Sequence, residues 1–168
     1  TSSTIAKIKT VKLATSSYVY DGKEKKPSVS VKDSNGKTIK STYYTVTYSG
    51  KRKSVGTYSV KITFKGNYSG SKTLKFKIVL GQVTNIKYTE NGKGMTLSWN
   101  KVKGATGYIL YEYNTKTGKY EEKFRTKSNS VGKDKVSDDS YTVTIRAYYL
   151  RDGKEYYGEY SSAKRIKL

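Results

Sequence analysis

The sequence predicts an all-β protein that consists of two small domains in tandem. Strand-favouring residues dominate it, with 20 Thr, 18 Tyr and 13 Val against 7 Leu and 5 Ala. β-Branched and aromatic side chains suit a pleated, half-buried surface. Short runs such as residues 44–48 and 58–64 alternate apolar with polar residues, which is typical of a sheet with one solvated face. Turn signals such as Asn35-Gly36 and Asp152-Gly153 separate these runs.

One feature of the composition points toward disorder instead. Leu, Ile, Val and Phe together make up only 32 of the 168 residues, beside a net charge of +21, a combination that is typical of unfolded chains. The 18 Tyr supply large apolar rings that this count omits. We therefore expect folded domains with a thin core.

The strands expected in the first domain follow one another at short intervals. Residues 5–13 form the first, a second begins at Val29, and further strands cover residues 44–48, 58–64 and 74–78. The single proline, Pro27, comes just before the strand at Val29, where its missing backbone donor matters least.

The domain boundary is expected at Leu80-Gly81-Gln82, which gives domains at residues 1–80 and 81–168. Because this linker is short, we expect limited bending between the two. Residues 1–80 hold 17 basic and 3 acidic side chains, and residues 81–168 hold 17 and 10. Most of the positive field therefore belongs to the first domain.

Residues 83–168 contain four stretches that form one pattern: Thr-Leu-Ser-Trp at 96–99, Gly-Tyr-Ile-Leu-Tyr at 107–111, Tyr-Thr-Val-Thr-Ile-Arg-Ala-Tyr at 141–148 and Tyr-Gly-Glu-Tyr-Ser at 157–161. Together they resemble a bacterial fibronectin type III domain. The resemblance implies a β-sandwich in which Trp99 is the core indole and Tyr141 is the corner tyrosine that ties a crossing loop. The inward-facing residues of the strand at 141–148 are expected to be Val143, Ile145 and Ala147.

Residues 16–79 contain a second set of stretches: Tyr-Asp-Gly-Lys at 20–23, Pro-Ser-Val at 27–29, Tyr-Tyr-Thr-Val-Thr-Tyr at 43–48, Gly-Thr-Tyr-Ser-Val at 56–60 and Gly-Asn-Tyr-Ser-Gly at 66–70. With these stretches, residues 16–79 resemble a bacterial immunoglobulin-like repeat that is common in surface proteins of gut Firmicutes. The resemblance implies a second β-sandwich and an extracellular location, secreted or attached to the cell wall.

The residue types argue against catalysis. The chain has no Cys and no His, which excludes disulfides and histidine-based acid–base or metal chemistry. Two adjacent carboxylate pairs occur, Glu121-Glu122 and Asp138-Asp139, but neighbours in a strand point to opposite faces. We therefore expect no catalytic site, no cofactor and no metal.

Two groups of side chains are candidates for binding a glycan or an anionic wall polymer. Basic residues would cluster if the turns at Asn35-Gly36 and Gly50 share one end of the sandwich; they are Lys37, Lys40, Lys51, Arg52 and Lys53. Tyrosines could stack on sugar rings; they are Tyr111, Tyr113, Tyr120, Tyr148, Tyr149, Tyr156 and Tyr157. In the alternative interpretation, the tyrosines are ordinary cross-strand contacts and the basic residues, Arg52 among them, are surface charges whose reversal leaves stability almost unchanged.

Specific nucleic-acid binding is not expected, because 29 of the 34 basic residues are Lys, whereas base and phosphate readout favours Arg. No apolar run approaches the length of a membrane span. The leading hypothesis is a monomeric, non-catalytic spacer within a larger bacterial surface or secreted protein, whose partners are the flanking domains of the same polypeptide. The alternative is a module that binds carbohydrate or an anionic surface polymer.

Overall fold

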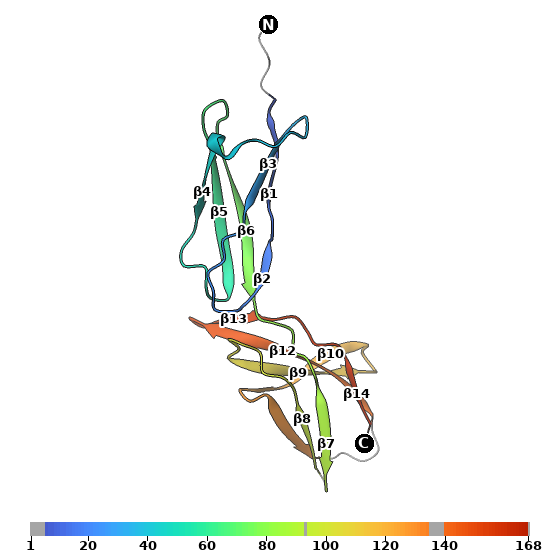
Figure 1. Cartoon of the computed structure of the whole chain (residues 1–168). Helices are drawn as coiled ribbons and strands as arrows, with labels where there is room; N and C mark the ends of the chain where they lie inside the picture. The colour runs from blue at the N-terminus through green and yellow to red at the C-terminus, as the bar shows by residue number, and fades with distance from the viewer. Residues whose placement is uncertain (1–5, 93, 135–139, 168) are drawn as a thin grey trace. The chain divides into compact units, whose positions relative to one another are not determined.

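The computed structural model describes residues 6–92, 94–134 and 140–167 (Figure 1). The chain divides into two compact units, which we call unit 1 (Thr1–Ile78) and unit 2 (Val79–Leu168). This division lies two residues before the boundary expected from the sequence at Leu80-Gly81. Each unit is built from antiparallel strands, so the prediction of an all-β chain with two β-sandwich domains is confirmed.

Unit 1 consists of a two-stranded sheet and a four-stranded sheet (Figure 1). Its strands are β1 (Ile8–Leu13), β2 (Ser17–Val19), β3 (Val29–Asp33), β4 (Tyr44–Tyr48), β5 (Gly56–Phe64) and β6 (Ser71–Val79), with a short 3-10 helix, η1 (Ser41–Tyr43), before β4. β1 pairs with β3, and the other sheet has the order β2-β6-β5-β4. The predicted strand at 44–48 coincides with β4, and those at 58–64 and 74–78 lie within β5 and β6.

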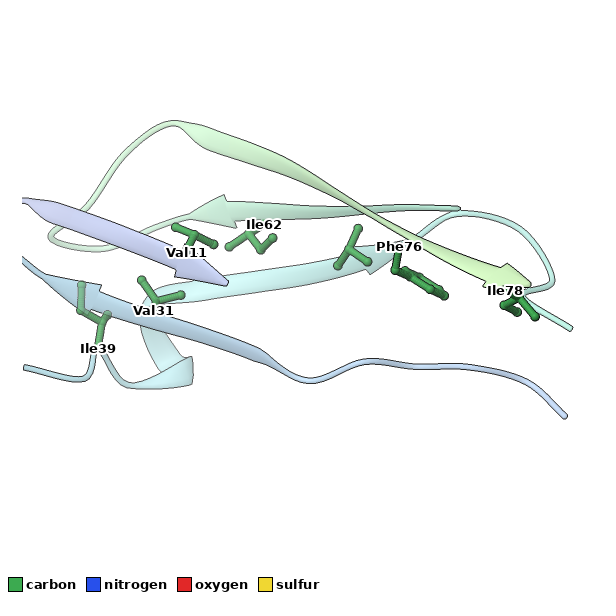
Figure 2. Packing of buried hydrophobic residues seen from close by; sticks show 7 residues of the cluster. Val11, Val31, Ile39, Ile62, Phe76 and Ile78 are labelled. Carbon is green, nitrogen blue, oxygen red and sulfur yellow. The ribbon is translucent and has the colours of Figure 1, made fainter. Parts of the chain in front are cut away.

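The core of unit 1 lies between these two sheets (Figure 2). Val11 of β1 and Val31 of β3 lie near Ile62 of β5, and Phe76 and Ile78 of β6 lie further along the same core (Figure 2). The residues between the buried ones are exposed, as the period of two requires. Burying a side chain of this size stabilises a fold by roughly 1.5–3 kcal/mol.

Unit 2 consists of a three-stranded sheet, β11-β8-β7, and a larger sheet, β10-β9-β12-β13, in which β14 also pairs with β12. Its strands are β7 (Lys87–Asn91), β8 (Gly94–Ser98), β9 (Gly107–Asn114), β10 (Lys119–Thr126), β11 (Ser130–Asp134), β12 (Tyr141–Arg151), β13 (Lys154–Tyr157) and β14 (Lys164–Ile166). The predicted strands at 107–111 and 141–148 lie within β9 and β12.

Trp99 is a core residue of unit 2, as predicted. Only 3% of it is exposed, and its ring meets that of Tyr108 edge to face with the centroids 5.4 Å apart. The prediction that Val143, Ile145 and Ala147 face inward is also confirmed, because all three are fully buried. The hydroxyl of Tyr141 donates a hydrogen bond to Met95 Sδ at 2.8 Å; this contact joins β12 to β8, and hence one sheet to the other.

Candidate functional site

The basic residues named from the sequence in unit 1 do not come together. Lys37 and Lys40 precede β4, whereas Lys51, Arg52 and Lys53 follow it. A five-residue strand separates its ends by about 16 Å. The Asn35-Gly36 and Gly50 turns therefore lie at opposite ends of the sandwich, contrary to the condition on which this cluster depended.

Arg52 is a structural residue rather than a surface charge. Only 8% of it is exposed, and its guanidinium group lies over the ring of Tyr48 at 5.0 Å. Nε donates to the carbonyl oxygen of Lys25 at 2.9 Å, and Nη1 donates to that of Gly50 at 2.5 Å. Nη2 donates to Glu24 Oε1 at 2.8 Å. These bonds occupy the guanidinium group, so Arg52 belongs to the framework of unit 1.

The exposed lysines of unit 1 are distributed over both of its sheets. Lys61, Lys75 and Lys77 alternate with buried residues along β5 and β6. Lys12 and Lys32 do the same along β1 and β3. This arrangement solvates the outer faces of the sandwich and gives a broad positive field rather than a localised site.

The tyrosines named in unit 2 mostly gather on the outer face of the larger sheet. We call this surface the tyrosine face and define it by Tyr111, Tyr113, Tyr120, Tyr148, Tyr157 and Tyr160 together with Arg125 and Arg146. Tyr149 and Tyr156 pair with each other one position along the same strands, so they point to the opposite side. Tyr160 was not a candidate from the sequence; its place three residues after Tyr157 in an irregular segment gave no periodic signal.

Arg146 holds the centre of the tyrosine face. Its guanidinium carbon lies 3.9 Å from the ring centroid of Tyr157, 4.6 Å from that of Tyr160 and 5.3 Å from that of Tyr111. Its Nε also donates to the hydroxyl of Tyr111 at 3.0 Å. Cation–π contacts of this kind contribute about 0.5–2 kcal/mol each, so one cation fixes three rings.

Arg125 carries the second charge network of this face. It lies 5.5 Å from the ring centroid of Tyr148 and forms ion pairs with Glu122 and Glu155. The hydroxyl of Tyr157 donates to Glu155 at 2.5 Å. This hydrogen bond and the one from Arg125 lower the pKa of Glu155, and the hydrogen bond to Glu155 raises the pKa of Tyr157. The charges here are therefore compensated locally.

Exposed aromatic area is concentrated on the tyrosine face. Among the described residues, six large hydrophobic side chains are exposed, and four of them lie here: Tyr113 (39%), Tyr120 (42%), Tyr157 (40%) and Tyr160 (45%). A cleft of about 360 Å³ opens on the same face; it is lined by Tyr120, Thr144, Tyr160, Ser161 and Ala163.

A larger cavity of about 500 Å³ lies between the two sheets of unit 2. Leu97, Leu110 and Val143 form part of its apolar wall, and its charged residues are Glu112, Lys123 and Arg125. Exposed residues such as Lys123 and Arg125 line its other side, so the cavity is open to solvent.

The carboxylates considered for catalysis are occupied by neighbours. Glu121 accepts a hydrogen bond from Asn114 Nδ2 at 2.8 Å, and Glu122 is paired with Arg125. Asp138-Asp139 lies outside the described residues. Within the described ranges, no group of His, Cys, Asp or Glu could hold a metal ion, and no helix is long and apolar enough to cross a membrane.

Comparisons with known proteins place the chain by its fold. No family model matches it, and no curated protein matches it in sequence. A segment of two fibronectin type III domains from chicken tenascin superposes with a TM-score of 0.56 at 15% identity, over 96% of this chain and 98% of that one. Titin domains A168–A170 give 0.44 at 12%, over 95% and 66%, and a mutant of FN3tt gives 0.40 at 17%, over 54% and 94%. The chain therefore has the fold of two β-sandwich domains in tandem, similar to that of the tenascin segment.

Proposed function

We propose that this chain is a non-catalytic accessory pair within a larger secreted or cell-wall-attached bacterial protein, where it spaces or presents a neighbouring catalytic or adhesive domain. One observation carries the proposal: each unit has its own buried core and its own pair of sheets. Self-contained modules of this kind can be placed in series without depending on a partner for folding.

The charges of unit 1 support the same role. Its three acidic residues serve local structure: Asp21 pairs with Lys25, Glu24 with Arg52, and Asp33 accepts the backbone N–H groups of its own turn. Its lysines decorate both outer faces. A solvated, evenly charged surface suits a module that keeps other domains apart.

A distance measurement tests the spacer role. The chain lacks cysteine, so spin labels can be attached at Ser34→Cys in unit 1 and Thr115→Cys in unit 2, both in exposed turns. Because a spacer must hold its neighbours at a set separation, we expect a narrow distance distribution between the labels. The control pair, Ser34→Cys with Lys53→Cys, lies entirely within unit 1. It gives the width of the distance distribution when no linker lies between the two labels. A distribution several times broader than this control would contradict a spacer.

A second candidate function, carbohydrate binding by unit 2, is favoured by the four exposed tyrosines of the tyrosine face. Aromatic rings offer an apolar surface and a polar tip, which suits the alternating C–H and O–H groups of a sugar. Attraction to an anionic polymer would instead use the lysines of unit 1. Because those lysines are spread over two sheets, that attraction is expected to weaken as salt rises.

A binding screen separates these functions. The purified chain is tested against neutral oligosaccharides and heparin, at low salt and at about 0.15 M salt. Binding to a neutral glycan that is unaffected by salt would support recognition by unit 2. Binding to heparin alone, lost as salt rises, would indicate only the general attraction of the +21 charge. If the chain binds none of these probes, the second candidate function is contradicted and the spacer role remains.

A further inference from the structure

We infer that the cleft between Tyr120 and Tyr160 is a subsite for one neutral sugar ring of a glycan. This inference rests on the second candidate function above and assigns it a place and a ligand class. The cleft has a volume of about 360 Å³ and is lined by Tyr120, Thr144, Tyr160, Ser161 and Ala163. Ligand sites in proteins range over roughly 300–1,000 Å³, so the cleft has the size of a site for a small group rather than for a long chain segment.

The two tyrosine walls are exposed, yet other rings hold them in place. Tyr120 meets Tyr113 edge to face at 5.2 Å, and Tyr160 meets Tyr111 in the same way at 5.3 Å. Arg146 lies over the Tyr160 ring at 4.6 Å. A binding group that is fixed before the ligand arrives loses little conformational entropy on binding. The walls are therefore preorganised.

The floor of the cleft is rigid for a different reason. Thr144 Oγ1 donates to the carbonyl oxygen of Ser161 at 2.9 Å, and the N–H of Ile145 donates to Ser161 Oγ at 2.9 Å. Thr144 and Ser161 are both buried. These bonds tie the segment that carries Tyr160 to β12, so the distance between the two walls follows from the sandwich itself.

The charge of the lining selects the kind of ligand. The five lining residues carry no carboxylate, ammonium or guanidinium group, although the chain as a whole has a net charge of +21. The cation nearest to the cleft is Arg146, which lies over the Tyr160 ring and is engaged by the rings of Tyr111 and Tyr157. Its Nε also donates to the hydroxyl of Tyr111. A sulfated or phosphorylated ligand needs cations at its site, and this cleft offers phenol rings and hydroxyls. The cleft is complementary to a neutral, hydroxyl-bearing ring.

The test uses the full chain labelled with ¹⁵N and titrated with soluble chitotetraose, cellotetraose and maltotetraose, with heparin as the anionic probe. We expect one of the neutral oligosaccharides to shift the amide signals of Thr144, Ser161 and Ala163. Tyr160→Ala and Tyr120→Ala should each weaken that affinity about tenfold. Tyr160→Phe keeps the ring and should retain most of the affinity. Tyr156→Ala, on the other side of the sheet, is the matched control and should change nothing.

Several outcomes would overturn the inference, and they differ in what else they affect. In one outcome, a neutral oligosaccharide shifts the amide signals of other residues of unit 2 and binds Tyr120→Ala and Tyr160→Ala with unchanged affinity. That result would contradict the cleft as the subsite but would still support carbohydrate recognition by unit 2. No binding of any neutral oligosaccharide would remove both. Signals at the cleft that move only with protein concentration would show that a second copy of the chain covers it, and shifts caused by heparin alone would show an anionic ligand.

Discussion

Arg52 Nη2 lies 2.8 Å from Glu24 Oε1, and this pair joins two loops of unit 1 that are 28 positions apart in the sequence. The same guanidinium group also donates to the carbonyl oxygens of Lys25 and Gly50. One side chain thereby ties together the loops at the end of the sandwich where β4 leads into β5, and its removal would take a charged donor from part-buried carbonyl groups.

Replacing Arg52 should therefore destabilise unit 1. We expect Arg52→Ala to lower the free energy of unfolding by about 1–3 kcal/mol, because part-buried hydrogen-bond acceptors lose a charged donor. Arg52→Glu should have a larger effect, since it brings a second carboxylate close to Glu24. Urea denaturation followed by circular dichroism measures the change.

The neighbouring Lys53 provides the control for Arg52, because it is exposed. Lys53→Glu should change the free energy of unfolding by less than about 0.5 kcal/mol. Equal effects of the two charge reversals would show that Arg52 is an ordinary surface residue, as the sequence alone had suggested.

Trp99→Ala should destabilise unit 2 by about 3–5 kcal/mol through the cavity that it leaves beside Tyr108. Trp99→Phe should be milder, because the buried indole Nε1 has no hydrogen-bond partner among the described residues and Phe lacks this polar atom. The denaturant midpoints of the two variants test whether Trp99→Ala is the more destabilising.

As the only tryptophan, Trp99 should also fluoresce at short wavelength in the native protein. Emission typical of a solvated indole would contradict its burial.

Ser161→Ala should weaken unit 2 by about 1–3 kcal/mol, because the N–H of Ile145 loses its acceptor in a buried place. Ser162→Ala is the control, since Ser162 is exposed and should be nearly neutral. Thermal unfolding of both variants gives the comparison. If the two melt alike, the hydroxyl of Ser161 is not holding the segment before β14 against β12.

The protein should lose stability in alkaline solution. Burial raises the pKa of Tyr48, Tyr111 and Tyr141 above the ordinary value of 10.0. A group with a raised folded-state pKa stabilises the fold fully below its unfolded value, and this contribution is lost as the pH rises beyond it. Denaturant midpoints should therefore stay level from about pH 8 to pH 10 and fall above that. Tyr141→Phe should reduce the fall for unit 2, and an unchanged slope would assign it to other groups.

The larger strands were predictable because their side chains alternate strictly. β4 and the inward-facing residues of β12 follow from the period of two alone. β10 did not, because Lys119–Thr126 is mostly charged and polar, and a bulge between Glu122 and Phe124 breaks its alternation. It is a strand because β9 supplies its hydrogen bonds. β2 is not predictable either, because its three residues are too few to show an alternation.

The sequence by itself determined the fold class and which side chains of the regular strands face inward, since local alternation places Val60 and Ile62 on one face and Lys61 on the other. It also supplied the tyrosines of unit 2. Only the tertiary structure decided which of them meet, because cross-strand neighbours depend on register and on hydrogen bonds between distant segments. The tertiary structure also decides that Arg52 is buried, that Lys40 and Lys51 are separated, and that Tyr160 lies opposite Tyr120. Each of these relationships involves segments outside a single strand.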